Sequence, residues 1–319
     1  MDGFIQALQD IINAPEFLIN SCTFLPEFFR QAMIKCVYFI PLLYFLYFGI
    51  ELLERFILKR LHIFIKLVQR LGALLGIAIS IIPECGYQVI ASTFYTREMI
   101  SKGTLLAFLI MCSDEALPLL FMDLEKVNII LPLLAIKAVV AIVTAIVVDI
   151  VDYLAHLGNK KVQKQNSIND DLNVPGCCHH MMMSIEHPAF WYMHPFTHTV
   201  NIFVFSLITL TVIYGLSTFY GSTDALAQIL MINSPLQVVL MGLIGLASNC
   251  VMSVVIALAY VNGIISFPAL VAGMISVTGL GLATLTRQNT RKKNDTSSFS
   301  LILLIISIAT GLFVFYYMQ

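Results

Sequence analysis

Two carboxylates stand side by side inside an otherwise apolar stretch of this 319-residue chain. The stretch reads MCSDEALPLL, residues 111–120, with Asp114 and Glu115 at its centre and Pro118 one turn further on. A carboxylate at the centre of a membrane helix costs about 2.5–3.5 kcal/mol on insertion scales, so it faces a partner, water or an ion. The pair therefore predicts a buried site for an ion or a proton. In the alternative interpretation, one carboxylate caps a kinked helix and the other pairs with a lysine.

A second unusual stretch precedes these carboxylates. IIPECGYQVIAS, residues 81–92, brings proline, glutamate, cysteine and glycine together in the middle of an apolar run. A helix breaks there, because proline lacks a backbone N–H and glycine frees the backbone. Unpaired backbone at membrane depth is tolerated only where it lines a cavity buried in protein. We therefore expect polar side chains of both stretches to share one site: Glu84, Cys85, Gln88, Asp114 and Glu115.

The interrupted stretch occurs twice. Residues 71–120 align with residues 236–285 at an offset of 165 without a gap, and thirteen positions are identical. The identities include residues that are not merely apolar: Cys85 with Cys250, Tyr95 with Tyr260, and Ser101 with Ser266. In the second copy the two carboxylates become Gly279 and Leu280. We therefore expect an asymmetric site, charged from the first copy, with neutral ligands from both copies: Ser113, Asn249, Cys250, Ser253 and Thr278.

The elements that must position these residues are membrane helices. Hydrophobic residues make up 59% of the chain and charged residues only 12%, whereas soluble domains average about 25% charged residues. Apolar windows of spanning length, roughly 17–25 residues each, cover residues 32–53, 103–122, 129–153, 197–220, 267–286 and 299–318. Two more apolar segments, 71–96 and 236–261, are interrupted near their middles. The sequence predicts an all-α polytopic membrane protein.

Each interrupted segment could cross once as a broken helix, or enter and return as a re-entrant hairpin. The positive-inside rule favours hairpins, because one face then collects the basic residues of 55–70, 97–102, 160–164 and 287–293. With hairpins the two copies are inverted relative to one another. Inverted repeats with broken helices that meet near the midplane are typical of secondary transporters.

The expected organisation has two membrane halves. Residues 1–30 form an amphipathic segment at the interface rather than a signal peptide. Residues 31–157 form the first half, with its repeat at 71–122, and residues 196–319 form the second half, with its repeat at 236–286. Residues 158–195 form a cytoplasmic Cys/His-rich loop. The net charge of −1 excludes a basic surface for nucleic acid.

Two further groups carry candidate metal ligands. Asp149, Asp152 and His156 share one helix face; Asp149 lies inside the apolar run and is the predicted ligand, while a solvated helix end explains the other two. The Cys/His-rich tract supplies weaker candidates, since thiolate and imidazole suit Zn²⁺-like ions: Cys177, Cys178, His179, His180, His187 and His198. A loop with incidental histidines, or for His198 a core histidine, is the alternative.

Carboxylate, thiolate and amide ligands together suit a divalent transition metal. We expect Mn²⁺ as the cargo, with Zn²⁺ and Fe²⁺ left open, and no resident cofactor.

There is no GxxxxGK[ST] motif, so the chain does not hydrolyse ATP itself. The predicted function is a secondary transporter, not an enzyme, that exports the metal by proton or ion exchange. The partners are the lipid bilayer, the metal ion and, by analogy with other hairpin transporters, a second copy of the chain. An oxyanion or small organic solute, a membrane metalloenzyme and a metal sensor are the alternatives.

The sequence IPECGYQVIASTFYTREMIS followed by LLAFLIMCSDEALPLL resembles a known signature. It is similar to the first repeat of ten-helix heavy-metal exporters, bacterial and archaeal proteins described as manganese transporters or arsenic-efflux-like permeases. The resemblance covers nearly the whole chain from about residue 30, and HTVNIFVF and a second cysteine motif follow in the same order. It implies an integral protein of a prokaryotic inner membrane. The second motif reads SNC where the family implies PNC, and Asn201 stands where a lysine is common.

Overall fold

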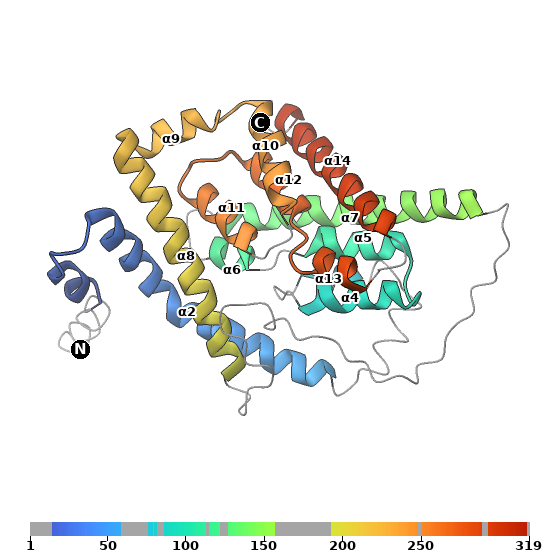
Figure 1. The fold of residues 1–319 in the computed structure, drawn as a ribbon, viewed down its shortest axis with the longest axis horizontal. Helices are drawn as coiled ribbons and strands as arrows, with labels where there is room; N and C mark the ends of the chain where they lie inside the picture. The colour runs from blue at the N-terminus through green and yellow to red at the C-terminus, as the bar shows by residue number, and fades with distance from the viewer. Residues whose placement is uncertain are drawn as a thin grey trace.

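In the computed structural model, helices are the regular secondary structure of the residues that it describes, and turns or short irregular segments join them (Figure 1). These are residues 15–58, 76–78, 80–81, 86–112, 115–121, 127–156, 193–247, 251–288 and 293–317. Residues 15–21 form a helix ahead of the first long helix. The predicted all-α class is confirmed over this part of the chain.

Four long helices have predominantly apolar sequences: α2 (Glu27–Leu58), α7 (Ile130–His156), α8 (Met193–Tyr220) and α14 (Lys293–Tyr317). Together with the apolar segments Lys102–Phe121 and Phe267–Arg287, they are the six spans of the described chain that are long and apolar enough to cross a membrane. All six coincide with predicted windows, although the first begins at Glu27 rather than at residue 32. This indicates an integral membrane protein.

Two of the six spans are not continuous helices, which the sequence windows did not predict. The span Lys102–Phe121 consists of α5 (Lys102–Met111) and α6 (Ala116–Phe121). The span Phe267–Arg287 consists of α12 (Phe267–Ser276) and α13 (Gly281–Gln288). Pro118 lies in the first turn of α6, where a proline needs no intrahelical N–H partner. Each break therefore places a helix end in the middle of an apolar span.

The helix boundaries reproduce the offset found in the sequence. α11 (Val251–Val261) begins and ends 165 residues after α4 (Gly86–Thr96), and α12 begins and ends 165 residues after α5. The turns between them match as well. Glu98 has φ 59° and the corresponding Gly263 has φ 72°. The two copies thus fold into the same helix–turn–helix unit, followed by the same break.

The packing of the helices is reciprocal between the copies. α5 packs along α7, and its counterpart α12 packs along α14. α4 lies beside α13 of the other copy, and α11 lies beside α6 of the first, as Figure 1 shows. The short helix after each break, α6 or α13, therefore packs against a helix of the other copy. Elements of both copies enclose the two breaks.

Close approach of the helices depends on small residues. A Cβ added at Gly103 of α5 would meet the Ala145 carbonyl of α7. A Cβ added at Gly245, which ends α10 (Pro235–Gly245), would meet Ser276 and Gly273 of α12. Small residues at such contacts let helix backbones pack closely in a membrane, where the hydrophobic effect supplies little force between helices. These contacts hold α5 and α12 at the centre.

Burial separates central helices from peripheral ones. All of α5 from Gly103 to Met111 is buried, and so is α12 from Pro268 to Ser276. In contrast, α7 and α14 each carry an exposed apolar stripe: Val139, Val143, Ile146 and Ile150 on α7, and Leu301, Ile305 and Phe313 on α14. Exposed apolar stripes of this kind on spanning helices contact lipid. The breaks in α5–α6 and α12–α13 are thereby shielded from the bilayer.

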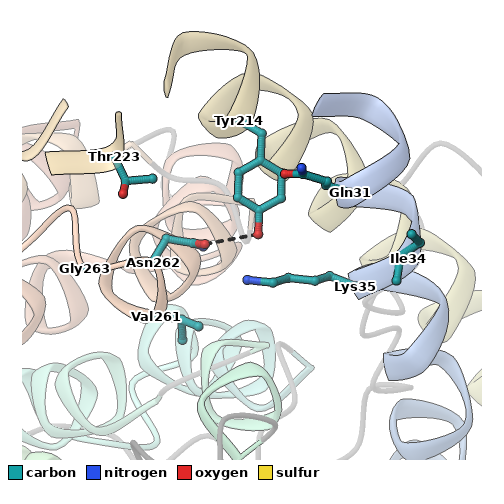
Figure 2. A pocket seen from close by; sticks show the side chains of 8 residues that line it. All are labelled: Gln31, Ile34, Lys35, Tyr214, Thr223, Val261, Asn262 and Gly263. Carbon is teal, nitrogen blue, oxygen red and sulfur yellow. Dashed lines mark hydrogen bonds between the residues drawn. The ribbon is translucent and has the colours of Figure 1, made fainter. Parts of the chain in front are cut away.

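An open cavity of about 630 Å³ lies at the turn between α11 and α12 (Figure 2). It is lined by residues of α2 and α8, the start of α9 (Thr223–Ile229) and the turn: Gln31, Ile34, Lys35, Tyr214, Thr223, Val261, Asn262 and Gly263. The Tyr214 hydroxyl donates to the Asn262 side-chain oxygen at 3.2 Å, and the Lys35 ammonium lies 5.4 Å from the centre of the Tyr214 ring. The predicted site residues that the structure describes are not among those that line this cavity.

Candidate functional site

Glu115 lies at the break between α5 and α6, directly before the first residue of α6. Its side chain is 3% exposed. The Ser253 hydroxyl of α11 is within 3.4 Å of the Glu115 Oε2 atom and donates to it. Ser253 is itself fully buried. The structure therefore brings together one carboxylate of the first copy and one predicted neutral ligand of the second.

The same break holds a buried cation that the sequence reasoning missed. Lys137 of α7 is 0% exposed, and its ammonium donates to the Cys112 carbonyl at 2.7 Å. Cys112 caps the C-terminal end of α5, where helix carbonyls lack intrahelical partners and the dipole is negative. An ammonium is therefore electrostatically favoured at that end. A lone lysine in the run LPLLAIKAVVAIV was a signal for this role, because ionisable residues within spans are functional candidates.

Gln88 and Ser92 of α4 contact the start of α13. The Gly281 N–H donates to the Gln88 side-chain oxygen at 3.4 Å, and the Ser92 hydroxyl donates to the Gly281 carbonyl at 2.8 Å. A Cβ at Gly281 would lie 2.7 Å from a methyl group of Leu109 of α5, so a larger residue here would displace that side chain. Gln88 is thus located at the break of the second copy. Ser92 was not predicted.

Thr278 lies in the break between α12 and α13 and is 0% exposed. Within the described part of the chain, its hydroxyl has no hydrogen-bond partner. Its carbonyl accepts from the Gly281 N–H at 3.0 Å. A buried hydroxyl without a partner loses hydration that nothing replaces, so this oxygen is available to a ligand.

Four half-helices start at these two breaks. Ser253 and Gln88 each lie in the first turn of their helix, and they contact the starts of α6 and α13 respectively. The N-terminal ends of α11 and α6 therefore meet at Glu115, and those of α4 and α13 meet at Gly281. Helix N-termini carry partial positive charge. This polarity stabilises the Glu115 carboxylate and attracts anionic groups.

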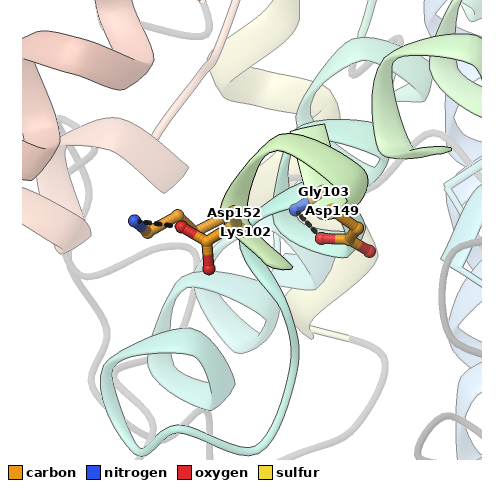
Figure 3. A network of polar contacts seen from close by, with 4 residues as sticks. All are labelled: Lys102, Gly103, Asp149 and Asp152. Carbon is orange, nitrogen blue, oxygen red and sulfur yellow. Dashed lines mark hydrogen bonds and ion pairs between the residues drawn. The ribbon is translucent and has the colours of Figure 1, made fainter. Parts of the chain in front are cut away.

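Asp149 lies beside Gly103 at the start of α5 (Figure 3), whereas Glu115 follows the C-terminal end of that helix. Its carboxylate accepts from the Gly103 N–H and from the Ser101 hydroxyl, both at 2.8 Å. The neighbouring Asp152 pairs with Lys102 at 2.8 Å, and both of these side chains are more than a third exposed. Asp149 therefore caps the start of α5 from α7, and the structure does not bring it together with Glu115.

Substitution of Asp149 separates a cap from a metal ligand. Asp149→Ala should lower the free energy of unfolding by about 1–2 kcal/mol, as expected for loss of a helix cap. Asp149→Asn keeps an acceptor and should lower it less. Thermal unfolding of purified protein in detergent, with and without Mn²⁺, measures both effects. If Asp149 is a cap, the stabilisation by Mn²⁺ stays as in the wild type; its loss in Asp149→Asn would identify a ligand. Asp152→Asn is the matched control, since an exposed pair contributes little.

His198 is a core residue of the α2–α8 pair. It is 2% exposed, and its ring stacks on the Tyr47 ring with centroids 5.2 Å apart. In the described ranges as a whole, no three His, Cys, Asp or Glu side chains are grouped as a metal site.

Several predicted ligands lie outside the described residues. Shortly before α4, α6 and α11 in the sequence these are Glu84, Cys85, Ser113, Asp114, Asn249 and Cys250. In the Cys/His-rich loop they are Cys177, Cys178, His179, His180 and His187. The described members of the predicted site are Gln88, Glu115, Ser253 and Thr278, and all four lie at the two breaks.

A scan of protein-family models and searches of curated proteins and of solved structures find no match to this chain.

Proposed function

We propose that this protein is a secondary active transporter that exports a divalent transition metal, with Mn²⁺ as the preferred cargo, across a prokaryotic inner membrane. The observation that supports it most is Glu115, a carboxylate buried at a helix break and contacted by Ser253 of the other copy. A buried carboxylate is expensive in a membrane protein and marks an ion or proton pathway. The resemblance to heavy-metal exporters supports the same function.

The proposal includes an inverted repeat with two re-entrant hairpins. Matching helix bounds at an offset of 165 and the reciprocal packing of α4 with α13 and α11 with α6 support it. In transporters built this way, the cargo binds near the midplane at the interface of the repeats. Movement of one copy against the other would then expose the Glu115–Ser253 contact to each side in turn.

In the proposed mechanism, Glu115 binds the metal together with the other predicted ligands of the first copy, Glu84, Cys85 and Asp114. Ser253 orients the Glu115 carboxylate, and Gln88 fastens α4 to the second break. Protonation of the carboxylates on the far side discharges the metal, so that protons move against it. Lys137 keeps the α5 end closed against α7.

A second candidate cargo is an oxyanion or a small anionic organic solute. The meeting of the α4 and α13 N-termini at Gly281 favours it, because helix N-termini bind anions. Flux into inside-out vesicles separates the two cargoes. Vesicles with the wild-type protein should accumulate ⁵⁴Mn²⁺ faster than empty vesicles when a pH gradient is imposed, and unlabelled arsenite should not compete. Competition by arsenite, or no Mn²⁺ flux at all, would favour the anion.

A further inference from the structure

The two copies can be matched beyond the breaks, into the long helices α7 and α14. Gly103 approaches Ala145 closely, and Pro268, its counterpart in α12, lies against Gly311 of α14. Gly311 comes 166 residues after Ala145, one more than the offset within the repeats. Burial follows the same register: Ile130, Leu133, Lys137 and Ala141 correspond to Thr296, Phe299, Leu303 and Ser307, and all eight are buried. α14 is thus the structural counterpart of α7.

This register places Leu303 where the first copy has Lys137. In the first copy the lysine ammonium contacts the Cys112 carbonyl at the end of α5. The residue that corresponds to Cys112 is Val277, at the end of α12. Neither Leu303 nor any residue of the break Val277–Leu280 carries a charge. The second copy therefore has the same negative helix end, with leucine at the position of the lysine.

Oxygen atoms are nevertheless available at that end. The Thr278 hydroxyl is fully buried and lacks a partner among the described residues. The last turn of α12 adds carbonyls that helix geometry leaves without an intrahelical N–H; of its residues, Gly273 already accepts from the Val277 N–H and from the Ser276 hydroxyl. The helix dipole makes this end negative. The arrangement offers neutral oxygen ligands in a favourable field for a cation.

We propose that a monovalent metal cation, Na⁺, binds at the break between α12 and α13, with the Thr278 hydroxyl and the carbonyls of the α12 end as ligands. The Lys137 ammonium occupies the equivalent position in the first copy. This inference rests on the proposed transport function, and it adds a bound Na⁺ at the second break to the proton exchange at the carboxylates of the first copy. Half-helix C-terminal ends and unwound carbonyls coordinate Na⁺ in secondary transporters.

The chemistry of the break selects among small cations. A proton needs a titratable side chain, and the sequence Val-Thr-Gly-Leu at 277–280 contains none. A divalent ion in a buried site needs carboxylates to balance its charge, and those of the proposed metal site belong to the first copy. A singly charged ion bound by a hydroxyl and carbonyls therefore suits the second break. At the first break, the single positive charge of the Lys137 ammonium takes the same place.

Thermal unfolding of the purified full-length protein without Mn²⁺ tests this proposal. NaCl should raise the midpoint in a saturable way relative to choline chloride at equal ionic strength, because a ligand of the native state stabilises it. Thr278→Val should raise the apparent Kd for Na⁺ at least about tenfold, as loss of a metal-site contact does. Thr278→Ser, which keeps the hydroxyl, should retain the response. Thr296→Val is the matched control, since Thr296 is another buried hydroxyl without a partner in the described chain and lies on α14.

The outcomes separate this inference from the proposed function. A wild-type protein with no Na⁺-specific rise, or a Thr278→Val variant with an unchanged rise, overturns the inference even if Mn²⁺ flux is present. A protein with the Na⁺ response but without Mn²⁺ flux overturns the proposed cargo alone. Should Thr278→Val fail to fold, Thr278→Ala is used in the same titration, and an unchanged Na⁺ response in that variant counts against the proposal.

Discussion

Glu115→Gln should abolish Mn²⁺ transport while leaving the protein folded. Glutamine has the same shape and can still accept from the Ser253 hydroxyl, so packing at the break is kept. The variant lacks the negative charge that the proposed mechanism requires for binding a divalent cation. We expect a fall in initial ⁵⁴Mn²⁺ flux of at least about a hundredfold, since partners outside the first ligand shell alone contribute about 10–100-fold to metal affinity. Flux into proteoliposomes, normalised to monodisperse protein on size-exclusion chromatography, measures the change.

Controls for Glu115→Gln define what the result means. Ser253→Ala removes the donor at 3.4 Å and keeps the carboxylate, so its effect should be smaller. Asp152→Asn removes a carboxylate at the exposed end of α7 and should leave flux as in the wild type. Asp114→Asn is tested beside them. Its flux should fall as far as that of Glu115→Gln if both side chains are ligands. Wild-type flux and metal tolerance in both Asp114→Asn and Glu115→Gln would exclude the proposed mechanism.

Lys137→Met should have the second largest effect, on both stability and transport. Methionine fills most of the volume of the lysine stem but leaves the buried Cys112 carbonyl without its donor. Loss of a hydrogen bond to a charged group costs about 1.5–3 kcal/mol, and the break that holds Glu115 loses the positive charge of Lys137. We expect a lower midpoint of thermal unfolding. We also expect the flux to fall by at least about tenfold, because a loss of about 1.4 kcal/mol corresponds to a factor of ten in an equilibrium constant.

Two variants separate the charge of Lys137 from its hydrogen bond. Lys137→Gln keeps a donor without charge, and Lys137→Arg keeps the charge in a larger group. If charge compensation matters, Arg should restore more flux than Gln at equal stability. Equal flux in Lys137→Met and the wild type would show that the ammonium has no part in transport. Lys102→Met, at the exposed end of the same helix pair, is the matched control.

The sequence was sufficient for the helical class, for the six spans and for the duplication, because each depends on local patterns. Apolar windows of about 20 residues detect a span by its average hydropathy. The same averaging hid the breaks at Cys112–Glu115 and Val277–Leu280, since an interruption of four residues barely changes the mean. The short stretch TGLG, with Gly279 at φ 46°, was the local signal for the second break.

The contacts of the site were less predictable, because they depend on tertiary register. Ser253 reaches Glu115 across 138 positions of sequence, and no local pattern fixes that pairing. Asp149 was predicted as a ligand because it is acidic and lies in an apolar run; its role as a cap for Gly103 follows only from the antiparallel packing of α5 and α7. Lys137 was visible in the sequence, but its acceptor is a backbone carbonyl, which has no sequence signature.

The two inter-helix turns are fastened by different chemistry. Asp149 and the Lys102–Asp152 pair hold the turn before α5, whereas the neutral Gln237 amide accepts from the Ser266 N–H and hydroxyl before α12, and donates to the Ile264 carbonyl. Added salt screens exposed charges and leaves an amide bond nearly unchanged. Ionic strength should therefore loosen the turn before α5 and leave the turn before α12 nearly unchanged.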